Sequence, residues 1–223
     1  MKFIKLFSKR SFLLLYLFQF ILVALMAQDP RRFEKEIHDL VAGDSTISKR
    51  KLILFTGSSS IRFWSGLRKD FPNHNVLNRG FGGSEMSDLL YYAEPLILNY
   101  NPKEIFIYEG DNDINSGKSP EEILANADKL LSLLRAHLPA KVKIIFISAK
   151  PSIARWHLKE KYEEFNRQLK AWTSTKKNVL YADVWTPMLD SSGAVRKDLF
   201  IEDNLHMNQV GYGIWATAIR KFM

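Results

Sequence analysis

The sequence predicts an α/β domain with three layers, α/β/α, around a central, mostly parallel sheet of five strands. Five short apolar runs, each bounded by turn-forming residues, alternate with longer segments of helical periodicity. Such alternation is typical of a parallel sheet that helices cover on both faces. The 223 residues, of which 46% are hydrophobic, also supply enough apolar material for one core.

The five predicted strands are rich in β-branched and aromatic residues, which pack well on a pleated surface. In chain order they are residues 51–57, 75–80, 104–110, 141–148 and 179–184. The first three runs end in glycine and the fourth ends in serine, residue types that favour turns. Open parallel sheets form their sites at the carboxyl ends of the strands, so the residues that follow these runs are candidates for chemistry.

The predicted helices carry apolar residues at helical spacing. They are residues 32–41, 84–99, 119–137, 156–174 and 208–221. The third has clear start signals: Ser119 stands at the N-cap, Pro120 takes the first helical position, and Glu121 and Glu122 follow in the first turn. These residues suit the free amide groups and the positive dipole end of a helix start.

The composition excludes several classes of protein. There is no cysteine, which excludes disulfide scaffolds, cysteine-ligated zinc and a cysteine nucleophile. The aromatic content of 13% argues against a disordered chain. Only 11 glycines and 8 prolines are present, too few for a collagen-like or proline-rich chain.

The amino-terminal segment has the pattern of a secretory signal. The first ten residues carry four basic side chains and no acid, and residues 12–27 are apolar except for Gln19. This run ends in Ala27 and is followed by polar residues, the order expected around a cleavage site. This run of 16 residues is also shorter than the roughly 20 that a spanning helix needs.

We therefore expect a signal peptide at residues 1–27 and one domain at residues 28–223. The mature protein is expected to be exported, either to the periplasm or outside the cell, without stable membrane insertion. An uncleaved anchor stays open because Leu25 is large for its position before the cleavage site. Removal of the segment takes away four positive charges and lowers the net charge from +8 to +4. Such mild, scattered basicity does not indicate a nucleic-acid partner.

Polar residues follow the predicted strands in a pattern that suits a serine hydrolase. The relevant segments are residues 57–60, 78–83, 110–113 and 203–206. A hydrolytic nucleophile needs a hydroxyl at a sharp turn, a base, a group that orients the base, and donors for the oxyanion. Strand-end serines can supply the hydroxyl, and His206 with Asp203 can supply the base and its orienting group.

The four segments resemble the sequence blocks of the SGNH (GDSL-type) hydrolases, a family of small esterases and acylhydrolases. The blocks are Gly-x-Ser after the first strand, a glycine-rich turn after the second, Gly-x-Asn-Asp after the third, and Asp-x-x-His near the end. They occur in the family's order, and the resemblance covers residues 52–222. It implies the flavodoxin-like SGNH hydrolase fold.

The resemblance also implies roles for individual residues. Ser59 would be the nucleophile, with its own N–H as one oxyanion donor. Gly83 would give a second N–H and Asn112 a side-chain N–H. His206 would be the base, and Asp203 would orient it. No metal or organic cofactor is implied.

One position departs from the family pattern, because Gly57-Ser58-Ser59 stands where Gly-Asp-Ser is usual. A subset that resembles bacterial acylhydrolases and platelet-activating-factor acetylhydrolase carries a stretch similar to residues 57–64, so the nucleophile is retained. Ser58 corresponds to the missing acid, and Ser60 is expected to cap the following helix. Trp64 and Trp156, near strand ends, are candidates for pocket walls, although large aromatics more often lie in cores.

Other residues compete for the same roles. Gly43-Asp44-Ser45 is a literal Gly-Asp-Ser, but it follows a helical pattern and is interpreted as a helix-ending turn. Only His206 has an acid three residues earlier and a helix start just after it. The other histidines are His38, His74, His137 and His157.

Three alternative motifs fit less well. A calcium loop starting at Asp111 would have Ser116 where glycine is needed. The run Gly80-Phe81-Gly82-Gly83 lacks the spacing of a nucleotide-binding turn. The α/β-hydrolase elbow Gly-x-Ser-x-Gly is excluded because Ile61 takes the place of its second glycine. Asp113 is expected to hold the turn in which it lies.

The predicted function is that of an exported serine esterase or acylhydrolase that cleaves short acyl, acetyl-type esters through an acyl-enzyme. The substrate is expected to be a small-molecule, carbohydrate or lipid ester. A lysophospholipase-like lipase, an O-acyltransferase that uses the same serine, and a catalytically silent carbohydrate-binding module remain as alternatives. The oligomeric state is left open.

Overall fold

The computed structural model describes residues 29–223, so the predicted signal segment lies outside the described residues. The chain divides into two compact units, the first ending at Lys35 and the second spanning Glu36–Met223. In the first, the Asp29 side chain caps a 3-10 helix at Pro30–Phe33. The second contains every residue to which the sequence assigns a chemical role.

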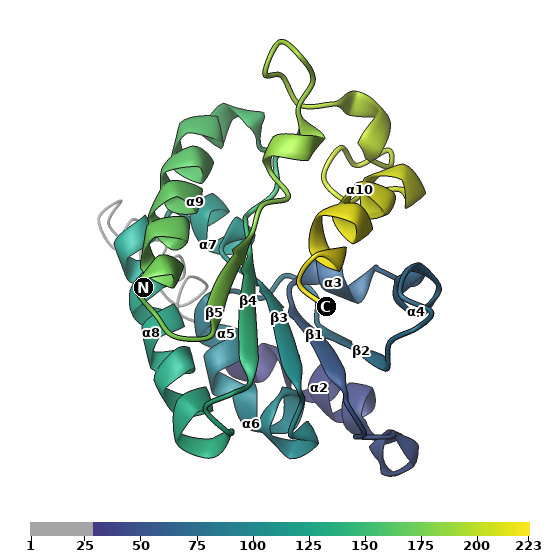
Figure 1. Ribbon diagram of the computed structural model, residues 1–223. Coiled ribbons are helices and arrows are strands. Elements are labelled where there is room, and N and C mark those ends of the chain that lie inside the picture. The colour runs from purple at the N-terminus through teal and green to yellow at the C-terminus, as the bar shows by residue number, and fades with distance from the viewer. Residues whose placement is uncertain (1–28) are drawn as a thin grey trace, which may run out of the picture. The chain divides into compact units, whose positions relative to one another are not determined.

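The second unit is built on a sheet of five strands that are all parallel (Figure 1). The strands are β1 (Ile53–Gly57), β2 (Val76–Gly80), β3 (Glu104–Tyr108), β4 (Lys143–Ile147) and β5 (Val179–Ala182). Their spatial order, β2-β1-β3-β4-β5, is the flavodoxin-like order. In this order β2 is added on one side of β1 and the later strands on the other side, so the switch point lies between β1 and β3. The predicted fold class and all five predicted strands are confirmed.

Helices cover both faces of this sheet (Figure 1). The helices of residues 29–223 are α2 (Glu34–Val41), α3 (Ser59–Arg62), α4 (Leu67–Asp70), α5 (Met86–Tyr91), α6 (Ala93–Leu96), α7 (Asp111–Asn115), α8 (Pro120–His137), α9 (Lys159–Ser174) and α10 (Gln209–Arg220). None of the helices within residues 29–223 is long and apolar enough to span a bilayer.

Side chains that alternate along the strands form two apolar layers. On one face, Phe55 of β1 stacks on Phe106 of β3 at a centroid distance of 4.6 Å, in a core that also contains Trp215 of α10. From β4, Phe146 points to the other face and meets Trp172 of α9 edge to face. Burial on both faces explains why these strands are almost continuously hydrophobic.

The predicted helix ends are partly confirmed. Ser119 caps α8 through a reciprocal capping box with Glu122. The single helix predicted at 84–99 is wrong, because the chain forms α5, α6 and a 3-10 turn there instead. The cause is Pro95: a proline ring clashes with the carbonyl four residues earlier, which belongs to Tyr91, the last residue of α5.

Candidate active site

The position of Ser59 is created by a sharp turn at the end of β1. Gly57 has φ +117°, and a Cβ there would lie 2.0 Å from the carbonyl oxygen of Tyr108, so only glycine fits. The chain then turns directly into α3, whose first residue is Ser59. This arrangement sets Ser59 at the carboxyl edge of the sheet, with its N–H among the amides that a helix start leaves without an intrahelical acceptor.

The neighbouring serines have roles different from those expected. The prediction that Ser60 caps the helix is wrong: Ser58 occupies the N-cap position, with extended backbone, and Ser60 is buried inside α3. Because β1 ends at Gly57 and the helix begins at Ser59, only Ser58 is available for the N-cap. Its side chain makes no capping hydrogen bond and is free to serve another partner.

Ser59, His206 and Asp203 form one hydrogen-bonded chain. The Ser59 Oγ lies 2.9 Å from His206 Nε2, and His206 Nδ1 lies 2.5 Å from Asp203 Oδ2. With Nδ1–H donating to the carboxylate, Nε2 is left as the acceptor for the serine hydroxyl. Although partial burial opposes it, the hydrogen bonds from His206 lower the pKa of Asp203 to about 2, so the acid is ionised at neutral pH.

The base and its acid share one tight turn before α10. Asp203 Oδ1 accepts hydrogen bonds from the backbone N–H groups of Leu205 (2.9 Å) and His206 (2.8 Å), and Asn204 takes a left-handed conformation with φ +59°. An antiparallel bridge between Phe200 and Met207 closes the base of this turn. His206 therefore reaches Ser59 from a turn that is held from within.

Asn112 lies in α7, after β3, and contacts the residue that precedes Ser59. Its Nδ2 donates to Ser58 Oγ at 2.7 Å and to the carbonyl oxygen of Ser84 at 2.9 Å. Gly83, immediately before Ser84, has φ +68° and open space around its Cα. The structure thus brings together all five predicted residues. Ser59, His206 and Asp203 are joined by hydrogen bonds. Asn112 is hydrogen-bonded to Ser58, which precedes Ser59, and to Ser84, which follows Gly83.

Comparison with known proteins places this chain in a family. A sequence model described as the GDSL-like Lipase/Acylhydrolase family matches residues 41–214. The chain belongs to this family. The predicted family and the prediction of an ester-hydrolysing enzyme are both confirmed.

Three relatives of this GDSL-family chain illustrate the similarity. Platelet-activating factor acetylhydrolase IB subunit alpha2 of Gallus gallus is 27% identical over 166 residues, which are 72% of this chain and 70% of the relative. A structure from Streptococcus pneumonia described as a platelet activating factor has a TM-score of 0.76 at 19% identity, covering 93% of this chain and 98% of that one. The acetylxylan esterase Axe2 from Geobacillus stearothermophilus has a TM-score of 0.62 at 18% identity, covering 76% and 93%.

A buried charged cluster contacts Asn112 through Arg155, and the sequence analysis did not predict it. Its centre is the Asp111 carboxylate, which accepts hydrogen bonds from Arg155 Nη1 (2.6 Å) and Lys150 Nζ (3.3 Å) and from two tyrosine hydroxyls, those of Tyr108 (2.7 Å) and Tyr162 (2.5 Å). Burial opposes ionisation of Asp111, but Lys150 and Arg155 outweigh it and lower the pKa. Both cations follow β4, the one strand whose carboxyl end the sequence search left out, and that position was the available signal.

Two further buried acids lie near the site. Glu109 is fully enclosed, receives a hydrogen bond from Ser84 Oγ at 2.6 Å, and has its pKa raised well above the ordinary value by burial and by nearby Asp113. The Asp113 side chain accepts from the backbone N–H of Met86, so it holds the start of α5, and it also lies 3.7 Å from Lys118 Nζ in the loop after its own helix. Burial also raises the pKa of Asp113, to about 6.

The competing residues take other positions in the fold. Asp44, of the literal Gly-Asp-Ser, pairs with Arg79 and with the Tyr100 hydroxyl, and Ser45 is exposed. The four remaining histidines are all exposed: His38, His74, His137 and His157. Trp64 is buried and donates to Asp70 at 2.6 Å. Within residues 29–223 no group of three or more acids and histidines is arranged to hold a metal ion.

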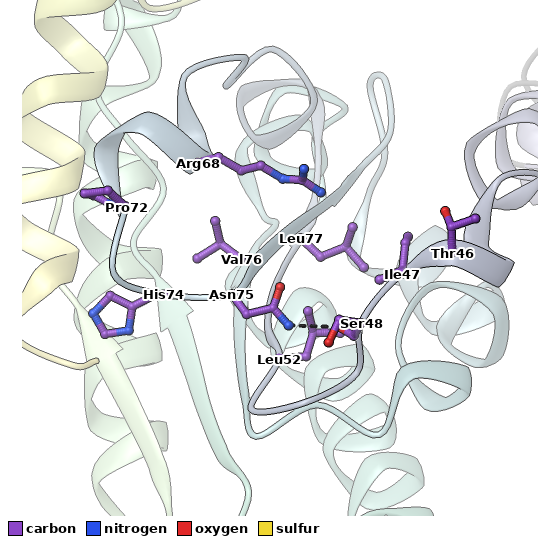
Figure 2. A pocket seen from close by; sticks show the side chains of 10 residues that line it. All are labelled: Thr46, Ile47, Ser48, Leu52, Arg68, Pro72, His74, Asn75, Val76 and Leu77. Atoms are coloured by element: carbon purple, nitrogen blue, oxygen red, sulfur yellow. Dashed lines mark hydrogen bonds between the residues drawn. The ribbon is translucent and has the colours of Figure 1, made fainter.

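A separate cavity of about 480 Å³ lies at the amino-terminal end of β2, away from the carboxyl ends of the strands (Figure 2). Its lining includes Val76 and Leu77 at the start of that strand, together with Arg68 and His74. Asn75 closes one side by donating to the Ser48 carbonyl at 2.8 Å. Because the catalytic candidates follow the carboxyl ends of the strands, this cavity does not belong to the site around Ser59.

Proposed function

We propose that this family member is a serine esterase in which Ser59 is the nucleophile, His206 the general base and Asp203 the residue that orients the base. The observation that carries the proposal is the continuous chain of contacts from Ser59 Oγ to His206 Nε2 (2.9 Å) and from His206 Nδ1 to Asp203 Oδ2 (2.5 Å). As Oγ attacks the ester carbonyl, its proton passes to Nε2, and the ionised carboxylate stabilises the imidazolium that forms.

The negative charge that develops on the carbonyl oxygen needs preorganised donors. We assign the backbone N–H groups of Ser59 and Gly83 and the side-chain N–H of Asn112 to this role. The position of Ser59 at the first residue of α3 supports the assignment, because that amide has no partner in its own helix. The Asn112 Nδ2 already points at the nucleophile loop through its bond to Ser58 Oγ.

The remaining steps return the enzyme to its starting state. The imidazolium of His206 gives its proton to the leaving alcohol, which departs and leaves the acyl group on Ser59. Water then attacks the acyl-enzyme while His206 takes its proton, and the collapse of the second intermediate returns that proton to Ser59 and releases the carboxylic acid.

For the substrate we propose short acyl esters, foremost acetyl groups on carbohydrate. The similarity of the fold to an acetylxylan esterase supports this class. So does Phe63, a ring that is 49% exposed and stands edge-on to the His206 ring at 4.9 Å, where it can pack against the face of a sugar. Export through cleavage of residues 1–27 belongs to the same proposal, and amino-terminal sequencing of secreted protein would test it.

The experiment combines labelling with turnover. A fluorophosphonate probe should label the wild-type chain and the Ser45→Ala control, which alters the literal Gly-Asp-Ser, but should not label Ser59→Ala. Hydrolysis of p-nitrophenyl esters should fall steadily from acetate to longer acyl chains, and acetylated xylo-oligosaccharide should release acetate. Labelling of Ser59→Ala would refute the assignment, and a preference for long chains would refute the substrate class.

A further inference from the structure

The hydrogen-bond partners of Asn112 define the orientation of its amide. Arg155 Nη2 donates to Asn112 Oδ1 at 3.0 Å, while Asn112 Nδ2 donates to the carbonyl oxygen of Ser84 at 2.9 Å. A guanidinium can only donate and a carbonyl can only accept. A flipped amide would set donor against donor on one side and acceptor against acceptor on the other, so a single orientation is allowed.

We propose that Arg155 is a positioning residue of the esterase: it holds the Asn112 amide so that an N–H faces the nucleophile, and its charge strengthens that N–H as an oxyanion donor. This inference rests on the proposed function. A cation on the amide oxygen draws electron density from the nitrogen, which makes the N–H a stronger donor to a developing negative charge.

The Arg155 guanidinium is itself held in place by Asp111. Arg155 Nη1 donates to the Asp111 carboxylate at 2.6 Å and to the Asp111 carbonyl oxygen at 3.1 Å, and the Arg155 side chain is only 13% exposed. Burial works against the charge of Arg155, but the Asp111 carboxylate raises its pKa, so the cation persists. One planar fork thus serves Asp111 with one nitrogen and Asn112 with the other, a geometry that lysine cannot reproduce.

The same loop also contacts the other half of the site. The backbone N–H of Ala154 donates to the carbonyl oxygen of Asn204 at 3.1 Å, one residue after Asp203. Arg155 therefore stands in the segment between β4 and α9 that contacts both the oxyanion side and the turn that carries His206. A residue in this place can set the distance between donor and base without touching the substrate.

The test is a double-mutant cycle on p-nitrophenyl acetate with the full chain. Arg155→Lys should lower kcat about tenfold with KM changed less than about twofold, because the donor acts in the transition state. In an Asn112→Ala background, Arg155→Lys should lower kcat by less than about twofold, because the residue through which it acts is gone. An equal loss in both backgrounds would overturn the proposal.

Controls separate this role from a structural one. Arg135 holds the backbone carbonyls of Val142 and Asn178, so Arg135→Lys should lower the melting temperature and leave kcat unchanged. If wild type is neither labelled by fluorophosphonate nor active, the proposed function fails. If wild type is active and Arg155→Lys equals it, only this inference fails.

A measurement on the unsubstituted residue covers the case in which Arg155→Lys does not fold. The Asn112 side-chain ¹⁵N resonance can be assigned by its loss in Asn112→Ala. Both of its protons should exchange with water far more slowly than those of an exposed asparagine, since one is held by Ser58 Oγ and one by the Ser84 carbonyl. Exchange as fast as that of an exposed asparagine side chain would show that the amide is not held and would overturn the proposal.

Discussion

Two carboxylates of the candidate site have basic partners, and the two pairs differ in construction. The Asp203–His206 pair is local, three residues apart in one turn, and its side chains are 42% and 19% exposed. The Asp111–Arg155 pair joins residues 44 positions apart, and its side chains are 6% and 13% exposed. The first pair reaches solvent and the Ser59 hydroxyl, whereas the second is buried and contacts the Asn112 side chain.

The difference indicates how the site divides chemistry from stability. A partly exposed pair contributes less to folding because water competes for the Asp203 carboxylate, which leaves Asp203 and His206 available for the proton transfer that we propose. A buried pair cannot lose a partner cheaply, because the remaining charge stays without water. Asp111 and Arg155 should therefore fix the geometry of the scaffold as well as that of Asn112.

The largest expected effect concerns the exposed pair. Asp203→Asn should lower kcat by roughly 10³–10⁴-fold, because the amide no longer stabilises the imidazolium or fixes the tautomer of His206. The melting temperature should change by no more than a few degrees. Steady-state kinetics and thermal melting check both parts, and a variant that melts early but keeps its rate would reverse the comparison.

The next effect concerns the buried pair. Asp111→Asn keeps the shape of the side chain but leaves Lys150 and Arg155 without their counter-charge, and should cost about 3–5 kcal/mol in the free energy of unfolding. Asp128, which pairs with Lys176 and has a 54% exposed side chain, provides the matched control. Asp128→Asn should cost about 0–1 kcal/mol. Equal costs in urea unfolding would contradict the contrast between buried and exposed pairs.

The oxyanion donor gives a smaller and purely kinetic effect. Asn112→Ala should lower kcat by about 100-fold, because one preorganised donor is lost in the transition state. Chain-length preference among p-nitrophenyl esters should stay as in the wild type, since the role proposed for Asn112 is to donate to the carbonyl oxygen and not to contact the acyl chain. A change confined to KM would show that Asn112 binds the ground state only.

The smallest effect is a pH dependence of stability. Folded Glu109 stays protonated while the carboxyl of the unfolded chain ionises above about pH 4.5, so the free energy of unfolding falls as pH rises from there towards the raised pKa of the folded state. Glu109→Gln is neutral in both states and should lessen this fall. Urea unfolding at pH 5 and pH 8 measures it, and identical slopes in both proteins would argue against a protonated Glu109.

Position relative to the strand ends made much of the site predictable from sequence. Ser59 and Asn112 follow apolar runs directly, and His206 stands out by the acid three residues before it. The Arg155 cluster gave a weaker signal. Lys150 and Arg155 also follow a strand, but nothing local distinguishes them from ordinary loop cations, because their partner Asp111 lies 39 and 44 residues away in the chain.

The fold was predictable wherever a local signal agreed with the tertiary structure. All five strands and the capped start at Ser119 follow from short patterns. The break of the 84–99 helix depends on one proline, and the exchange of roles between Ser58 and Ser60 depends on where β1 ends. A shift of one or two residues at an element boundary lies below what periodicity can resolve.

The tight turn that holds Asp203 and His206 has one more consequence. The hydrogen bonds that Asp203 accepts from backbone N–H groups lie within the turn itself. The hydrogen bond from this turn to Ser59, between His206 Nε2 and Ser59 Oγ at 2.9 Å, joins residues 147 positions apart. Warming that displaces this turn by about an ångström should silence the enzyme while its core is still intact. Activity should accordingly vanish below the melting temperature and return on cooling.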